Sequence, residues 1–523
     1  MVDMSGAPEQ NYFILRNSLY NVAGWAVPVV VNFVSVPIIV HKLGYDAYGV
    51  WTLVMAVMGY FTLLDMGGVK GGIRYLAEFN AKGDADQASA IVSLGLFAYL
   101  CIGLFGGLIL FTITDPVLLK LIKLPDELRP LARQVFHFAA LGFLLTMLQT
   151  YLLSLPQAVH RFDISTKVDS FFQVLNTAAT IIALNQGHGL LSVIILRIAS
   201  TALCCVAIVW LMRRCQPSWR LTRKIPLHLA RKIFSYSLTS FAGRIGIMTA
   251  NQLQVLVVGS ILGAASVTVF SIPFQLISRV MGISSRLSML IFPISSELSG
   301  TDRLDRLHEI YLSMSRMLFF LSMAQTLMFG LLAWDILAIW MGTAFASQAS
   351  EILILVAIGY FADTTTNLPT QVCDGLTSPK LTSMFAFVRG CTSIVFALVG
   401  GSVAGVYGVA VGFAASCIIM SLVFNMFVHS RVIGLSYGLV IIRTQAESLA
   451  FGIGLALVAL PFTLLKGKTS PDLVRFFLTA GALAVSLCVY GYLRICSRGQ
   501  RQQIRAMLAG ILRLKKRDTV DRR

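Results

Sequence analysis

Long apolar runs follow one another along almost the entire chain. They begin near Tyr12, after a short polar leader, and end near residue 495. Each run is continuous and about twenty residues long, which is the length that a helix needs to cross the hydrocarbon core of a bilayer. A barrel strand would instead alternate apolar and polar positions. The pattern therefore predicts an all-α polytopic membrane protein, and we expect the first run to be a retained span because it is too long for a signal peptide.

We predict about fourteen transmembrane helices from these runs. Their approximate ranges are 12–39, 49–72, 88–112, 132–155, 169–186, 190–212, 233–260, 267–290, 309–333, 349–369, 382–401, 405–430, 445–465 and 474–495. An even number of spans places both termini on one side of the membrane. With the N-terminus in the cytoplasm, the cytoplasmic segments hold about 28 Lys and Arg residues and the external loops about 7. The positive-inside rule therefore predicts that both termini are cytoplasmic.

The composition agrees with this interpretation. The 523 residues are 56% hydrophobic and 13% charged, whereas about a quarter of the residues in a soluble chain are charged. Because topology accounts for the formal charge of +18, we expect no nucleic-acid partner. The nine cysteines lie in apolar or cytoplasmic segments, which predicts neither disulfides nor a metal site, and we expect no cofactor. No loop is long enough for a separate catalytic domain, so we expect no enzymatic activity.

The chain also carries a weak internal repeat. At a shift of 219 residues, Ser18 aligns with Ser237 and Asn32 with Asn251. Internal duplication is typical of transporter folds. We therefore predict an N-lobe at 1–215, a basic cytoplasmic connector at 216–232, a C-lobe at 233–430, an extra helix pair at 431–495 and a basic amphipathic tail at 496–523. The connector and the tail are expected to lie against anionic lipid headgroups.

Polar residues share one face of several predicted spans, since positions three, four, seven or eleven apart lie on the same side of a helix. The candidates are Asn21 and Asn32 in the first span, Arg244 and Asn251 in the seventh, and Gln275, Arg279 and Arg286 in the eighth. Arg244 and Arg279 lie near the membrane midplane, about eleven and twelve residues into their spans. An arginine there costs at least about 2.5–3.5 kcal/mol on insertion scales, so we expect a wet cavity that binds substrate, with structural ion pairing as the alternative. The role of Arg197 stays open, and His137 is interpreted as a packed histidine.

The second span ends in ionisable residues and glycines. Asp65, Lys70 and Arg74 lie near its cytoplasmic end, among glycines that permit a bend or a close helix approach. We predict a gate in which Asp65 pairs with an arginine of the second lobe in one state and releases it in another. Asp363 is the other candidate carboxylate partner. The alternatives are a plain helix-end cap for Asp65 and snorkelling for Lys70 and Arg74.

Residues 17–79 resemble the amino-terminal region of Wzx-type polysaccharide flippases, which belong to the multidrug/oligosaccharidyl-lipid/polysaccharide exporter superfamily. The resemblance is specific over about the first ninety residues, and elsewhere it is mainly one of topology. The motifs that carry it are Leu43-Gly44, Tyr48-Gly49 with Trp51, Leu64-Asp65 with Gly67, and Arg74 with Ala77-Glu78. The Asp-Met-Gly sequence at 65–67 departs slightly from the commoner Asp-Leu-Gly.

This resemblance implies two six-helix lobes in a V shape, with two extra C-terminal helices. It also implies a function: translocation of an undecaprenyl-diphosphate-linked oligosaccharide across the bacterial inner membrane by alternating access, for polysaccharide biosynthesis. A polysaccharide polymerase and a chain-length regulator are further implied partners. The chain has no phosphate-binding P-loop, so an ion gradient, the membrane potential or removal of the product would supply the energy.

Four other interpretations remain. A lipid II flippase has the same span count and a cationic cavity, while a multidrug cation exporter should instead have an acidic, aromatic cavity. A membrane enzyme that polymerises or ligates lipid-linked sugars would need a large external loop, and the longest one here, roughly 113–131, is short. A scaffold without transport activity is disfavoured by the arginines at the midplane.

Overall fold

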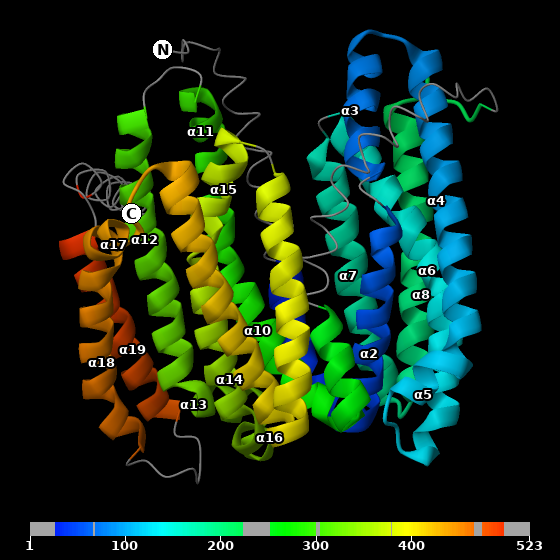
Figure 1. Ribbon diagram of the computed structural model, residues 1–523. Coiled ribbons are helices and arrows are strands. Elements are labelled where there is room, and N and C mark those ends of the chain that lie inside the picture. The colour runs from blue at the N-terminus through cyan, green and yellow to red at the C-terminus, as the bar shows by residue number, and fades with distance from the viewer. Residues whose placement is uncertain are drawn as a thin grey trace, which may run out of the picture. The chain divides into compact units, whose positions relative to one another are not determined.

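The computed structural model describes residues 27–65, 68–159, 161–222, 252–299, 304–377, 379–464, 473–495 and 501. Within these ranges the chain is helical almost throughout and contains no strand (Figure 1). Ten helical segments are long and apolar enough to cross a membrane, and Val27–Leu43 and Gln252–Leu262 are shorter apolar helices. The predicted all-α polytopic class is therefore confirmed. The count of fourteen spans and the V-shaped arrangement of lobes stay predictions.

The chain divides into two compact units. The first comprises residues 1–272 and 383–412, and the second comprises 273–382 and 413–523. These units are defined by packing and not by the sequence repeat, so the predicted lobe boundaries are not tested by them.

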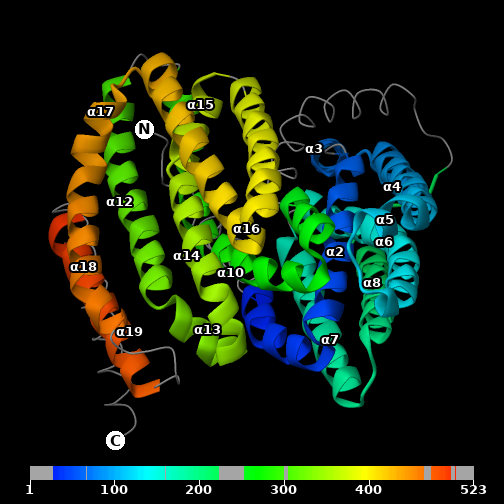
Figure 2. The ribbon, with the colours of Figure 1, turned by 60° about the horizontal axis from the view of Figure 1, so that its bottom comes forward.

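The first unit is built on α4, α6 and α8, which lie side by side (Figures 1 and 2). Its described helices are Val27–Leu43, α2 (Tyr45–Phe61), α3 (Gly68–Ala81), α4 (Ala85–Ile113), α5 (Leu119–Leu121), α6 (Arg129–Ala158), α7 (Phe162–Asn185), α8 (Leu190–Cys215) and Gln252–Leu262. Short 3-10 turns lie at Thr62–Asp65 and Asp126–Leu128, and a π-helical turn lies at Thr114–Leu118. Glycines bring α4 and α6 close together, since a Cβ on Gly103 would lie 2.9 Å from the Cα of Leu144.

The start of α10 (Ala264–Ser288) belongs to this first unit. The hydroxyl of Thr268 donates to the carbonyl of Tyr45 at 2.6 Å, and Gly259 lies against the side chain of Leu53. In the helix Gln252–Leu262, the buried Gln254 amide donates to the hydroxyl of Ser393. These contacts hold the chain on both sides of Gly263 against α2 and α16 (Lys380–Val428).

The helix α16 (Lys380–Val428) is two helices folded back on each other. The backbone leaves the helical conformation at Ala404 and at Gly405, where φ is +60°, a value that favours glycine. On either side of this turn, Gly400 faces Gly408 and Phe396 faces Gly412 at backbone contact distance. Small residues at four-residue spacing allow this approach. The break agrees with the predicted boundary between the spans 382–401 and 405–430.

The second unit contains α10 (Ala264–Ser288) from residue 273 on and α16 from residue 413 on. Its other helices are α11 (Ile291–Ser299), α12 (Leu304–Leu331), α13 (Ala333–Met341), α14 (Thr343–Thr364), α15 (Asn367–Leu376), α17 (Tyr437–Val440), α18 (Ala446–Leu464) and α19 (Leu473–Tyr490). Three π-helical turns lie at His429–Ile433, Ile441–Gln445 and Gly491–Ile495. Figures 1 and 2 show α18 and α19 beside α12, where the Tyr490 ring stacks on Phe451 with centroids 3.7 Å apart.

Candidate functional site

One face of α10 carries the predicted cationic stripe. Gln275, Arg279 and Arg286 lie within about 40° of each other on this helix. Arg286 is exposed, and Gln275 and Arg279 are half-buried. Gly282 lies on the same face, and a Cβ added there would meet no atom within 4 Å. This face of α10 therefore borders open space at the level between the two arginines.

The opposite face of α10 fixes the orientation of the helix. Phe270, Phe274, Ile277 and Met281 are buried on it. The Phe274 ring also packs against Phe413, with centroids 5.3 Å apart. Because the apolar side is held in this way, the arginine stripe cannot rotate into the core of the second unit.

A polar ladder joins the same buried side of α10 to α12. The Ser322 hydroxyl donates to that of Ser284 at 2.9 Å. The Gln325 amide donates to the carbonyl of Val280 at 3.0 Å. Each bond joins one donor to one acceptor at a fixed position along its helix, so the two bonds fix the register of α10 against α12.

The stripe lies deep along the helix. The apolar segment Ala264–Leu298 has 35 residues, and Arg279 is close to its centre. Arg286 lies seven residues further on, about 10 Å along the axis at 1.5 Å per residue. A guanidinium near the middle of a span is costly unless it meets water, an acid or an anion. The geometry thus suits an anion-binding surface.

A second deep arginine belongs to the first unit. Arg197 lies on α8 three, seven and eleven residues from Ile194, Cys204 and Ile208, which are all buried, so it lies on the helix face that points into the bundle. Its side chain is nevertheless exposed, and it makes no ion pair within the described ranges. It borders a cavity of about 10 Å³ between α2, α6 and α8, which has room for roughly one water molecule. The sequence alone left its role open.

A polar stripe on α7 was missed from the sequence. Asp169, Gln173, Asn176 and Thr180 share one side of this helix, and Gln173 donates to the Asp169 carboxylate at 2.8 Å. The predicted span began at Asp169, which made the acid look like a helix end. The helix in fact begins at Phe162, seven residues earlier, so the carboxylate lies about 10 Å inside it. Spacings of four, seven and eleven from Asp169 were the available signal.

Of the other predicted substrate-binding residues, Asn32 alone lies within the described part of the chain. Asn32 lies on the helix Val27–Leu43 and turns its side chain along that helix, donating to the carbonyl of Pro28 at 2.7 Å. Asn21, Arg244 and Asn251 lie outside the described residues. Their role in binding stays a prediction.

The predicted gate begins with a buried acid. Asp65 ends the 3-10 turn after α2, is 8% exposed, and accepts a hydrogen bond from the Tyr99 hydroxyl on α4. Tyr99 in turn stacks on Tyr151 with ring centroids 5.1 Å apart. Within the first unit, Asp65 is therefore tied to the core of the bundle. Pairing of Asp65 with an arginine of the second lobe stays a prediction.

The remaining gate candidates are less well defined. Lys70 and Arg74 lie on α3, and their side chains are outside the described part of the structure. Asp363 lies in the last turn of α14, where it is half-buried. Its backbone carbonyl accepts hydrogen bonds from Thr366. None of these observations tests a gating role.

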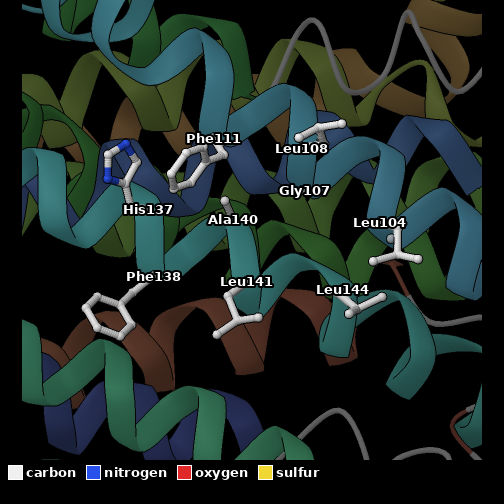
Figure 3. Close-up of a pocket in the computed structure, with 10 residues that line it drawn as sticks. Leu104, Gly107, Leu108, Phe111, His137, Phe138, Ala140, Leu141 and Leu144 are labelled. Atoms are coloured by element: carbon white, nitrogen blue, oxygen red, sulfur yellow. The ribbon is translucent and has the colours of Figure 1, made fainter.

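A crevice in the first unit is apolar. It has a volume of about 480 Å³ and lies between α4 and α6 (Figure 3). His137 is the one ionisable residue in its wall, and its ring stacks on Phe111 with centroids 4.3 Å apart. Leu104, Leu108 and Leu141 form much of the rest and are exposed. Such a surface suits hydrocarbon chains and offers no permanent cation to a phosphate, so it is not the headgroup site. Elsewhere in the described ranges, no group of His, Cys, Asp and Glu side chains could hold a metal ion.

Solved structures of transporters share this fold. The chain is similar to a lipid II flippase MurJ in an inward closed conformation, with a TM-score of 0.68 and 13% identity over 91% of this chain and 98% of that one. It is also similar to an inward-facing multidrug resistance MATE family transporter, with a TM-score of 0.59 and 15% identity over 80% and 94% of the two chains. The fold and the apolar helices define the class: a multi-pass helical membrane protein with the fold of these transporters.

The family follows from the sequence comparisons. A family model described as polysaccharide biosynthesis protein matches residues 42–350, and the chain belongs to that family. The membrane protein EpsK of Bacillus subtilis is 20% identical over 497 residues, covering 92% of this chain and 96% of the relative. A putative O-antigen transporter of Shigella flexneri is 21% identical over 387 residues, covering 71% and 87%. The predicted resemblance to polysaccharide flippases is confirmed.

Proposed function

We propose that this protein flips an undecaprenyl-diphosphate-linked oligosaccharide from the cytoplasmic to the external leaflet of the bacterial inner membrane. The observation that carries the proposal is the guanidinium stripe of α10, which lies deep in a span and borders open space at Gly282. A diphosphate-sugar headgroup is a large anion with many hydroxyl groups. Translocation of this headgroup needs cationic side chains near the membrane midplane and amide side chains beside them, and the stripe supplies both.

The chemistry of arginine supports an anionic cargo. A guanidinium presents a planar fork of donors that matches phosphate oxygens and stays charged at any physiological pH. Arg279 and Arg286 would bind the diphosphate, and Gln275 would donate to sugar hydroxyls. An organic cation would be repelled by the same stripe. This disfavours the multidrug exporter interpretation, although multidrug transporters share the fold.

Among lipid-linked anions, an oligosaccharide for a surface polysaccharide is favoured over lipid II. The support is the family to which the chain belongs and a relative named as a putative O-antigen transporter. The similarity to the lipid II flippase concerns the fold, because the two chains are 13% identical. The matched proteins whose names state an activity are transporters or flippases, which supports transport over catalysis.

The transport cycle would be alternating access, with two lobes rocking about a midplane site. Both termini would be cytoplasmic, and the connector and tail would contact anionic lipids. A polymerase and a chain-length regulator would act on the product after it is released outside. Asp65, Lys70, Arg74 and Asp363 remain the candidate gate residues.

The test is polysaccharide export in cells that carry variants in place of the native chain. Arg279→Gln removes the deep charge while keeping most of the side-chain length. We expect export to fall by at least tenfold with unchanged protein in the membrane, and Arg279→Lys to retain part of the activity. Arg306→Gln is the matched control, because Arg306 is an exposed arginine at the start of α12. Normal export by Arg279→Gln would contradict the proposal.

A further inference from the structure

A small pocket lies at one end of the first unit, between α4, α6, α8 and the segment that follows α8. Its volume is about 110 Å³. The floor is apolar and includes Leu96, Leu155 and Met212. The rim carries Arg213, Gln216, Trp219 and Arg220. The pocket thus has a hydrocarbon-like interior under a cationic edge, and we call it the α8 pocket.

Side-chain hydrogen bonds to the main chain build this rim. The backbone N–H of Arg220 donates to the hydroxyl of Ser89 at 3.0 Å, and that of Thr222 donates to Ser93 at 2.9 Å. Both serines lie on α4 and are buried. The N–H of Gln216 still bonds back to α8, at the carbonyl of Met212. Residues 216–222 are therefore held against α4 before any ligand arrives.

Among the described residues, no acid forms an ion pair with the cations on the rim. Arg213 and Arg220 are exposed, and neither makes an ion pair in the described part of the chain. The neighbouring arginines Arg161 and Arg214, in contrast, each have a partner. Arg161 donates to both carboxylate oxygens of Asp163, at 2.9 and 3.1 Å. Arg214 lies over the Trp210 ring, 3.9 Å from its centroid. Arg213 and Arg220 are thus available to an anion from outside.

We infer that the α8 pocket binds the headgroup of an anionic phospholipid of the cytoplasmic leaflet. The topology expected from the positive-inside rule places this end of α8 at the cytoplasmic surface, where anionic lipids attract basic pockets between helices. Trp219 is half-buried in the pocket wall, as suits an amphipathic ring at headgroup depth. The order of a cationic rim above an apolar floor matches the order of phosphate above hydrocarbon in a lipid.

Size favours a phospholipid over the transported cargo. A pocket of about 110 Å³ is smaller than the 300–1,000 Å³ typical of small-molecule sites. An oligosaccharide joined to a diphosphate would not fit in it, whereas a single phosphate group with two charge-assisted partners does. The α8 pocket is therefore distinct from the cargo-binding stripe on α10. Occupation would brace the first residues of the connector against α4.

The test is lipid retention by the purified full-length protein. The protein is taken from bilayer discs containing four parts phosphatidylcholine and one part phosphatidylglycerol, and native mass spectrometry counts the retained lipids. We expect Arg213→Gln/Arg220→Gln to weaken phosphatidylglycerol binding by about thirtyfold, because each arginine near the surface adds about 1 kcal/mol, or roughly five- to sixfold. Arg213→Lys/Arg220→Lys should keep most of it. Arg214→Gln is the matched control for the single variant Arg213→Gln, since it removes the same charge one residue away.

The outcomes decide between specific binding, general charge and the cargo. Equal retention by the double glutamine variant and the native protein would overturn the inference. Equal losses in the single variants Arg213→Gln and Arg214→Gln would overturn it too, because only net charge would then matter. Displacement of phosphatidylglycerol by substoichiometric undecaprenyl diphosphate would overturn it as well and assign the pocket to the cargo lipid. The assay contains no oligosaccharide and measures no transport, so its result is independent of the proposed flippase activity.

Discussion

The hairpin of α16 predicts that Gly408→Ala destabilises the protein strongly. A Cβ on Gly408 would lie 2.6 Å from the carbonyl carbon of Gly400, and closer still to its oxygen. Ordinary contacts begin at 3.4 Å, so the two backbones would have to separate by at least 0.8 Å. Because the obstacle is backbone, no side-chain rotation relieves it. Overpacking of this kind costs about 1–3 kcal/mol and occasionally more.

Two other glycines separate this effect from general glycine replacement. Gly405 has φ +60°, and a Cβ added to it would meet no atom within 4 Å, so Gly405→Ala tests backbone strain alone, at about 1–3 kcal/mol. Gly454 in α18 is helical and meets nothing within 4 Å, so Gly454→Ala should be neutral or stabilise by about 0.5–1 kcal/mol. The predicted order of stability is therefore Gly454→Ala, native protein, and then the two hairpin variants.

The assay is thermal unfolding of the detergent-solubilised protein, followed by the fraction that stays monodisperse on size exclusion. Gly408→Ala should lower the midpoint temperature by several degrees, and Gly454→Ala should leave it unchanged or raise it. A Gly408→Ala protein as stable as the native one would refute the packing argument for the hairpin. A large loss in Gly454→Ala would show instead that the assay responds to any replacement of glycine.

Three further predictions concern the polar residues. Tyr99→Phe removes the donor to buried Asp65 and should cost about 1.5–3 kcal/mol of stability, measured by the same thermal assay; an unchanged midpoint would argue against the bond. Tyr311→Phe removes the hydroxyl that lies 2.6 Å from His429 Nε2 and should cost less stability, about 1 kcal/mol. A loss of stability as large as that of Tyr99→Phe would contradict this order of the two variants. Arg197→Gln should lower polysaccharide export and leave the midpoint unchanged, because the Arg197 guanidinium makes no ion pair within the described ranges; a lower midpoint would mean that its role is structural.

Hydrophobic periodicity predicted most of the elements that the structure describes. Continuous apolar runs located the helices because a span must bury its backbone polar groups internally. The pattern was less reliable where a polar residue lies inside a long helix, as Asp169 does in α7. The pattern also predicted that the second span extends to residue 72, whereas α2 ends at Phe61 and the following 3-10 turn ends at Asp65. Helix ends depend on local hydrogen bonds that apolar periodicity does not encode.

The cationic stripe also shows which part of a site can be predicted from the sequence and which part cannot. Helical spacing alone placed Gln275, Arg279 and Arg286 on one face, because that face follows from 3.6 residues per turn. It could not show whether another helix covers the face. That depends on long-range packing, here the ladder between α10 and α12 and the open space beside Gly282. Asp65 illustrates the converse, since its Tyr99 partner lies 34 residues away and no local pattern indicates it.

The fold by itself does not select the cargo. A lipid II flippase and multidrug transporters share it with this chain at 13–15% identity, so the common helices are compatible with cargoes of different kinds. Discrimination must come from side chains that the fold tolerates but does not require. Arginines deep in a span are costly to insert and contribute nothing that leucine would not contribute to packing. The stripe on α10 is therefore where selectivity for an anionic headgroup should reside, and reversing its charge with Arg279→Glu should abolish export more completely than neutralising it.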